Sequence, residues 1–318
     1  MLTCRQIGLD DRHYWDDLIS KSSTASFFQT REWISLWMKH FKGNPYIVGV
    51  FEEEDCIGIG PFEKKGTTFE LLGSSEVLGK ELISDYGDII AQSGREEEVW
   101  KSLLAYREKE YQGLVLRFRF IQADSPSSSI LASLGFVKEK KDISPQLSLP
   151  GSWDEYLLLL DRHNRHELRR KMKRLGVSLR NLVVSECTSS DIDIFFHLMG
   201  ESSPQKAAFL TPLMKAFFQD MIKFYYEQSL LELIFLNFEG KSVAGALVFL
   251  YKNDVLLYNS GFDRTVYNLS PGFILSALLI QKAIEEKRRR FDFLRGEERY
   301  KFDLGAQARD VYTFSKKL

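Results

Sequence analysis

Three consecutive strands joined by short turns constrain the fold of this 318-residue chain more than any other feature. Strand-like runs at Leu231–Phe238, Val243–Tyr251 and Val255–Phe262 are separated by no more than four residues each. Turns of this length join neighbouring antiparallel strands. A largely apolar helix, from about Gly272 to Lys287, follows the third strand. This order excludes the alternating strand–helix order of a doubly wound parallel sheet.

The rest of the sequence reads as two halves, 1–150 and 151–318, with the boundary at Pro150-Gly151. Both halves show about the same order of elements, strand-helix-helix-strand-strand-strand-helix-strand, although no repeat is visible residue by residue. The pattern predicts an α+β fold in which each half has a mixed, mainly antiparallel sheet flanked by helices. The expected elements outside the three strands include Glu96–Tyr111, Trp153–Leu160, Arg162–Leu175 and Ser178–Cys187.

Composition narrows the class of protein. Lys and Arg (43) nearly balance Asp and Glu (44), which argues against general binding to DNA. The three cysteines are far apart, and the five histidines show no metal-ligand spacing, so we expect reduced thiols and no metal. The start of the chain has no apolar stretch typical of a signal peptide. The longest uncharged run, Thr265 to Gln281, is shorter than the ~20 apolar residues of a membrane span. We therefore expect a cytoplasmic protein.

Five segments of the sequence carry a family resemblance: SFFQTREWISLWMKHF, SDYGDII, RHNRHELRRKMKRLGVSL, GFDRTVYNLSPGFILSALLIQKAIEE and FDFLRGEERYKFDLGA. They resemble the GNAT (acyl-CoA N-acyltransferase) superfamily, most closely its CelD-like branch and the FemAB aminoacyltransferases, which have two GNAT-like halves. The resemblance implies two GNAT-like halves here also, and a bacterial protein of polysaccharide or cell-envelope biosynthesis. It further implies acyl-CoA as the donor and direct attack of an amine or hydroxyl on the thioester.

The start of the long apolar helix is the predicted coenzyme A site. Ser suits a helix cap, Pro suits the first turn, and Gly permits close approach of the backbone. Free N–H groups and the helix dipole at such a terminus favour a pyrophosphate. The usual Gly-rich or basic loop of the family is missing, and an ordinary capped helix is the alternative. The predicted cofactor-binding residues are Asn268, Ser270, Pro271, Gly272 and Phe273.

A charged segment directly after the strand at Phe291 is the predicted chemical centre. Acylation of an amine needs a base, an oxyanion donor and a proton donor for the leaving group. Glu297 or Glu298 could serve as the base, Tyr300 as the proton donor and Lys301 as a cation for the acceptor. Asp263, at the end of a strand, is a further catalytic candidate, with capping of the next loop as its alternative role. A solvated charged turn is the alternative for the whole segment.

The helix predicted at Arg162–Leu175 has a basic outer face, with seven Lys and Arg residues along its length. Such a face suits an anionic acceptor, an aminoacyl-tRNA or anionic lipid headgroups, and a solvated face is the alternative. Arg162, Arg165 and Arg169 share one flank and are the predicted acceptor-binding residues, together with Arg295, Asp85 and Tyr86. The acceptor is expected between the two halves, where clefts are common.

These observations predict a GNAT-type acyltransferase that moves an acyl group from acyl-CoA to a small-molecule or glycan-precursor acceptor. One alternative is Fem-type aminoacyl transfer from tRNA to a peptidoglycan precursor; the near-neutral charge and the single basic helix argue mildly against it. Another is a catalytically silent binding protein of envelope-polymer assembly, against which the Glu-Glu-x-Tyr-Lys stretch argues. Peripheral contact with a membrane is compatible with each reading.

Overall fold

The computed structural model describes residues 1–79, 82–106 and 113–318. These residues form two compact units, and each is described by itself. Met1–Ile143 together with Arg309–Leu318 form unit 1, and Ser144–Ala308 form unit 2. The division differs from the predicted halves mainly at the C-terminus, because the last ten residues lie with unit 1.

Unit 1 has a mixed sheet in the strand order β1-β2-β3-β4-β6-β13, with β5 paired to β3. β4 and β6 are parallel, and the other pairs within this unit are antiparallel. Its strands are β1 (Leu2–Gln6), β2 (Pro45–Glu52), β3 (Asp55–Lys65), β4 (Thr68–Leu71), β5 (Ile90–Ala91), β6 (Val115–Gln122), β7 (Val137–Ser148), which continues into unit 2, and β13 (Gln307–Lys317). Its helices are α1 (Arg12–Lys21), α2 (Arg31–Phe41), α3 (Glu96–Ala105) and α4 (Pro126–Ser133).

Unit 2 has a sheet in the order β7-β12-β11-β10-β9-β8, in which β11 and β12 form a parallel pair. The predicted antiparallel meander is confirmed by the β9–β10 and β10–β11 pairs. Its further strands are β8 (Leu182–Val184), β9 (Leu231–Phe238), β10 (Lys241–Tyr251), β11 (Asp254–Phe262) and β12 (Arg290–Asp292). Its helices are α5 (Trp153–Leu159), α6 (Arg162–Leu175), α7 (Ser189–Ser202), α8 (Pro204–Phe209), α9 (Pro212–Glu227), α10 (Pro271–Glu285) and α11 (Arg299–Asp303).

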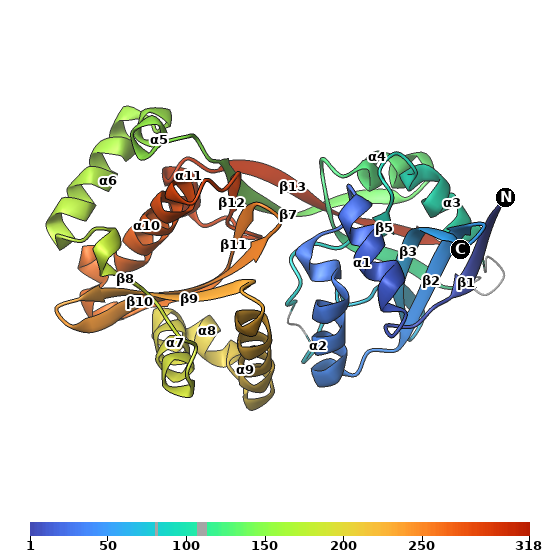
Figure 1. Ribbon diagram of the computed structural model, residues 1–318, viewed down its shortest axis with the longest axis horizontal. Helices are drawn as coiled ribbons and strands as arrows, with labels where there is room; N and C mark the ends of the chain where they lie inside the picture. Colours follow the sequence, from blue (N-terminus) through green and yellow to red (C-terminus); the bar gives the residue numbers. More distant parts are fainter. Residues whose placement is uncertain (80–81, 107–112) are drawn as a thin grey trace. The chain divides into compact units, whose positions relative to one another are not determined.

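Helices cover both faces of the unit 2 sheet. In Figure 1, α7, α8 and α9 lie on one side of β9 and β10, while α10 lies on the other side with α6 outside it. The apolar body of α10 accounts for this order, because a helix that is apolar nearly all round must be buried between two layers. Leu168 and Leu175 of α6 join Ile274 and Leu278 of α10 in one core cluster. The predicted α+β architecture, with helices flanking mainly antiparallel sheets, is confirmed.

β11 and β12 separate along their length. Their parallel pairing covers only Asp254–Leu256 against Arg290–Asp292, so the last six residues of β11 have no partner in β12. Helix α7 packs closely against this free stretch of β11. A Cβ atom at Gly261 would lie 2.3 Å from the backbone N of Met199, so only glycine permits this contact. The gap between the two strands is where the pocket described below opens.

Two predicted elements differ from the structure. The strand expected at Ser178–Cys187 shrinks to β8, because Ser178 and Asn181 cap a 3₁₀ turn at Leu179–Asn181 that replaces its first residues. The predicted helix Glu96–Tyr111 is confirmed over Glu96–Ala105, which is α3. The last part of the prediction, residues 107–111, lies outside the described residues.

Candidate functional site

A pocket of about 470 Å³ opens in unit 2 where β11 and β12 separate. Its wall combines the end of β11, the start of α10, the α11 segment and the α7–α8 connection. Clefts with apolar walls and a few convergent polar groups are common ligand sites. The residues that line it are Lys171, Ser202, Ser203, Lys206, Ser260, Phe262, Tyr267, Ser270, Pro271, Gly272, Phe273, Glu298, Tyr300 and Asp303.

The first turn of α10 presents backbone N–H groups to this pocket. Ser270 precedes the helix in the left-handed conformation (φ 57°), and its side chain makes no capping hydrogen bond. Pro271 has no N–H, and no acceptor within the described residues is found for the N–H groups of Gly272 and Phe273. Unpaired N–H groups at the positive end of a helix dipole suit a phosphate or pyrophosphate. The residues at this terminus therefore fit the diphosphate of coenzyme A.

Two cations flank the same helix start. The Nζ atom of Lys171 on α6 lies 4.2 Å from the centroid of the Phe273 ring, in a cation–π contact. Arg174 donates to the carbonyl oxygen of Asn268 (2.5 Å), which ties α6 to the loop that precedes α10. Asn268 does not line the pocket, whereas the other four predicted cofactor-binding residues do.

Tyr300 is coupled to the first turn of α10. It forms a side-chain hydrogen bond with Ser276, whose hydroxyl donates to the carbonyl oxygen of Gly272 (3.0 Å). Burial raises the pKa of the Tyr300 phenol, and the charge of Glu298 acts in the same direction. The phenol therefore keeps its proton at neutral pH, as a proton donor must.

Glu298 and Lys301 form an internal pair in the segment after β12. The Lys301 side chain is buried, and its Nζ contacts Glu298 Oε2 (2.9 Å) and the carbonyl oxygens of Arg295 (3.1 Å) and Gly296 (3.3 Å). The carboxylate lies so close to Gly296 that a Cβ there would be 2.5 Å from Oε2, and φ is 125°. An ammonium has three hydrogens, and all three acceptors lie within this segment. Lys301 therefore braces the segment, which differs from the acceptor contact expected from sequence.

The charge state of Glu298 follows from this pair. The Glu298 side chain is 60% exposed, which limits the desolvation that acts to raise its pKa. The charge of Lys301 and its hydrogen bond outweigh this desolvation, and the pKa lies below its ordinary value. Glu298 is thus an anion at neutral pH and a weak base. Such a carboxylate can accept hydrogen bonds from an ammonium group of a ligand.

Lys206 is the titratable residue with a strongly shifted pKa among the pocket residues that sequence reasoning missed. It lies in α8, and its Nζ donates to the carbonyl oxygen of Ser260 on the free stretch of β11 (2.5 Å). Burial lowers the pKa of Lys206 to about 8; the charge of Glu298 acts in the opposite direction, and that of Lys301 in the same direction as burial. A group that titrates near pH 8 can hold or release a proton under working conditions. The only sequence signal was the Ser203-Pro204 helix start, which predicts a helix and says nothing of the pocket.

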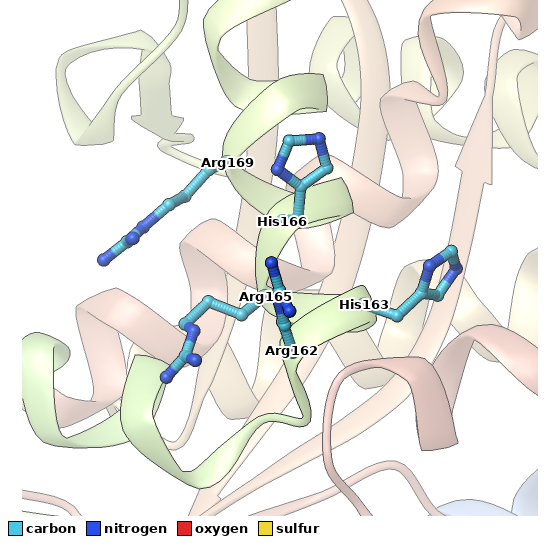
Figure 2. A pocket seen from close by; sticks show the side chains of 5 residues that line it. All are labelled: Arg162, His163, Arg165, His166 and Arg169. Carbon is cyan, nitrogen blue, oxygen red and sulfur yellow. The ribbon is translucent and has the colours of Figure 1, made fainter.

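A second hollow, of about 650 Å³, lies on the outer surface of α6. Figure 2 shows the side chains that line it spreading from the first turns of the helix, with the Arg165 and Arg169 side chains extending to the same side. Asp161 caps this helix by accepting from the N–H of Asn164 (2.8 Å), and Gly176 ends it in the left-handed conformation. The lining residues are Arg162, His163, Arg165, His166 and Arg169, so the structure brings the three predicted arginines together.

The other predicted residues of unit 2 lie outside both hollows. The carboxylate of Asp263 accepts from the backbone N–H (2.8 Å) and hydroxyl (2.7 Å) of Thr265, which makes it the cap of the turn Arg264–Leu269. These bonds lower its pKa. Glu297 is exposed and does not line the pocket, and Arg295 contributes its carbonyl oxygen to Lys301.

Asp85 and Tyr86 belong to unit 1, and their role in acceptor binding stays a prediction. The Tyr86 ring is buried, 6.1 Å from the Phe28 ring in an edge-on contact. Nearby Asp88 accepts from the hydroxyls of Ser125 and Ser127, both at 2.5 Å. Burial raises the pKa of Asp88 to about 7, although both hydrogen bonds act to lower it.

Within the described ranges, no group of three or more His, Cys, Asp or Glu side chains is arranged to hold a metal ion. The same ranges contain no helix whose length and apolar character would let it traverse a bilayer. The described cysteines Cys4, Cys56 and Cys187 are free thiols.

Comparison with known proteins bears on this architecture. The family model described as "Acetyltransferase (GNAT) domain" matches residues 162–302, which include every residue that lines the two hollows except Asp303. A comparison with curated proteins gives no match.

Solved structures show the same fold at low sequence identity. FemX has 13% identity and a TM-score of 0.68, with 99% of this chain and 97% of that chain covered. L-PGS from Bacillus licheniformis has 13% identity and a TM-score of 0.59, with 98% and 93% covered. A tandem GNAT protein from the clavulanic acid biosynthesis pathway has 11% identity and a TM-score of 0.56, with 99% and 98% covered. The part of the chain that the structure describes thus has a GNAT-like fold.

Proposed function

We propose that the protein is an acyltransferase whose donor, an acyl-CoA, binds in the unit 2 pocket. The observation that carries this proposal is the first turn of α10, where the N–H groups of Gly272 and Phe273 face a pocket opened by the separation of β11 and β12. The match of residues 162–302 to a GNAT domain supports the same assignment. When bound, acyl-CoA would supply the acyl group as a thioester.

Each of four residues in and beside the pocket has its own role in the proposed reaction. Glu298 is an anion that can orient the ammonium of an incoming amine. Lys206, with a pKa of about 8, is partly neutral near pH 8 and can take up the proton that the amine loses. Tyr300 retains its phenol proton and can give it to the departing thiolate. Lys301 is a positioning residue, because it acts through Glu298 and the loop carbonyls.

Two further observations bear on the acceptor and on an alternative donor. The basic hollow with Arg162, Arg165 and Arg169 favours an anionic acceptor, such as a phosphorylated glycan precursor. The similarity of fold to FemX favours a second candidate for the donor, an aminoacyl group delivered by tRNA, with the same pocket receiving the aminoacyl end.

The two donors can be separated by binding experiments on the full chain. Isothermal calorimetry and native mass spectrometry with coenzyme A, acetyl-CoA and longer acyl-CoA thioesters should show one bound molecule. Charged and uncharged tRNA would be tested in parallel by filter binding. Binding of charged tRNA together with no binding of any coenzyme A species would overturn the acyl-CoA proposal in favour of the second candidate. Binding of neither donor would contradict both.

A further inference from the structure

The α5–α6 hairpin of unit 2 carries an unusual pair of surface features. Leu158 and Leu159, adjacent at the end of α5, are 72% and 64% exposed. They are the two most exposed leucines among the residues that the structure describes. Contact of two adjacent leucine side chains with water is unfavourable in free energy unless another surface covers them.

The apolar pair lies beside a strong concentration of positive charge. Helix α6 carries Lys and Arg at seven positions and a single acidic residue, Glu167, in a protein whose formal net charge is −1. Glu167 pairs with Arg170 (2.7 Å), three residues along the helix. The outward side chains include Arg162, Arg169 and Lys173, all exposed.

Arg165 links the two features directly. Its guanidinium donates to the carbonyl oxygen of Leu157 (3.5 Å), the residue before the exposed pair, and it lines the basic hollow with Arg162 and Arg169. The basic hollow thus reaches the backbone of α5 one residue before the exposed leucines. In Figure 1 this hairpin forms the outer layer of its unit, with α10 between it and the sheet.

Neighbouring anions lower the positive charge of the hairpin but do not cancel it, because residues 153–175 contain seven Lys and Arg against four Asp and Glu. Asp161 is engaged by the backbone N–H and side-chain amide of Asn164 at the positive end of α6. Glu155 accepts from the backbone N–H of Gly151 (2.9 Å), and Asp154, one residue earlier in the first turn of α5, is exposed. These two acids precede the leucines by four residues, so they share the face of α5 that carries the leucines.

We infer that the α5–α6 hairpin docks the protein on an anionic membrane surface. The arginines of the hollow would hold lipid phosphates, while Leu158 and Leu159 enter the boundary between headgroups and acyl chains. A peripheral surface of this kind needs both an apolar edge and cations, and the hairpin supplies both. A nucleic acid would engage the cations, but its phosphate backbone has no use for two exposed leucines. The inference does not depend on the acyl transfer proposed above, and it assigns to lipid phosphates the arginines that an anionic acceptor would otherwise occupy.

The test is cosedimentation of the full chain with vesicles, in the absence of any donor or acceptor. Vesicles of equimolar phosphatidylglycerol and phosphatidylcholine should bind the protein, and vesicles of phosphatidylcholine alone should bind it at least ~10-fold more weakly. Raising the salt to 1 M should weaken the binding, because the Debye length then falls to about 3 Å.

Two double variants test the exposed leucines and the basic hollow separately. Leu158→Ser with Leu159→Ser should lower the vesicle partition coefficient about 10-fold or more, because two buried apolar side chains are lost. Arg162→Glu with Arg169→Glu should lower it by at least as much. Both pairs are exposed, so circular dichroism and thermal unfolding should match the wild type.

A matched control comes from α9, on the other side of the same sheet. Leu213→Ser combined with Lys215→Glu and Lys223→Glu removes one exposed leucine and reverses two exposed lysines. The affinity of this variant for vesicles should lie within about twofold of that of the wild type. Salt screens the attraction between the membrane and cations that lie more than a Debye length from it.

Three outcomes would overturn the inference. Equal loss in the α9 control would mean that overall charge, not the hairpin, governs binding. Failure of the wild type to bind anionic vesicles would refute membrane docking by the hairpin. If the arginine pair abolishes binding to tRNA in a filter assay while the leucine pair leaves vesicle binding unchanged, the hairpin is a nucleic-acid surface instead.

Discussion

Lys206 should titrate far below an ordinary lysine, and this can be measured without knowing any ligand. Its Nζ lies against the carbonyl oxygen of Ser260, and burial lowers its pKa to about 8. At pH 8 about half of its amine is then neutral, whereas an ordinary lysine with a pKa of about 10.4 is less than about 1% neutral. The neutral fraction of Lys206 is thus roughly 100-fold larger at this pH.

Competitive trace labelling with acetic anhydride, followed by peptide mass spectrometry, reports this difference. Only the neutral amine reacts, so the labelling of the Lys206 peptide should rise with a midpoint near pH 8. Exposed lysines in the same digest serve as internal standards. The rate per neutral amine will be reduced by partial burial, so the midpoint is the quantity to compare, not the absolute rate.

Substitution of Glu298 tests the direction in which its charge shifts the pKa of Lys206. The negative charge of Glu298 acts to raise the Lys206 pKa, so Glu298→Gln should move the midpoint below 8. The positive charge of Lys301 acts in the opposite direction. A midpoint at pH 10 or above in the wild type, or an upward move in Glu298→Gln, would refute the geometry assigned to this pocket.

Three further predictions concern the same part of unit 2. Gly272→Glu should abolish the binding of coenzyme A, measured by calorimetry, because the new carboxylate repels its phosphates. Gly272→Ala places a Cβ at the same 3.0 Å from the Phe262 ring and should retain binding. Equal loss of binding in both variants would point to packing instead. Tyr300→Phe should slow thiol release from acyl-CoA about 10²-fold, followed with a thiol reagent, with donor affinity within about threefold; an unchanged rate would exclude the proton-donor role. Gly261→Ala forces a Cβ to 2.3 Å from the α7 backbone and should cost about 3 kcal/mol or more in unfolding free energy. Gly200→Ala, with nothing nearer than 3.8 Å, should instead stabilise α7 by about 0.5–1 kcal/mol; similar Tm shifts for these two variants would contradict the packing described here.

The local features of unit 2 could be predicted from the sequence. Short turns determine that β9, β10 and β11 form a meander, since chains reversed within a few residues pair antiparallel. The apolar composition of α10 places it between two layers, and the Ser-Pro-Gly start marks its beginning. The basic face of α6 follows from helical periodicity, and the structure gathers its arginines around one hollow as that periodicity requires.

Only the tertiary structure decided which side chains meet in the pocket. Lys206 and Glu298 are more than ninety residues apart in sequence, and no periodicity predicts that α8 and the segment after β12 line one cavity. The same limit explains Lys301: its charge suggests an exposed cation, but the turn at Gly296 brings two carbonyl oxygens and Glu298 to its ammonium. Local pattern determines helices, turns and faces, because these depend on neighbours a few residues away. Pairing between distant segments, and the pKa values that follow from burial there, depend on long-range packing, which a local pattern does not encode.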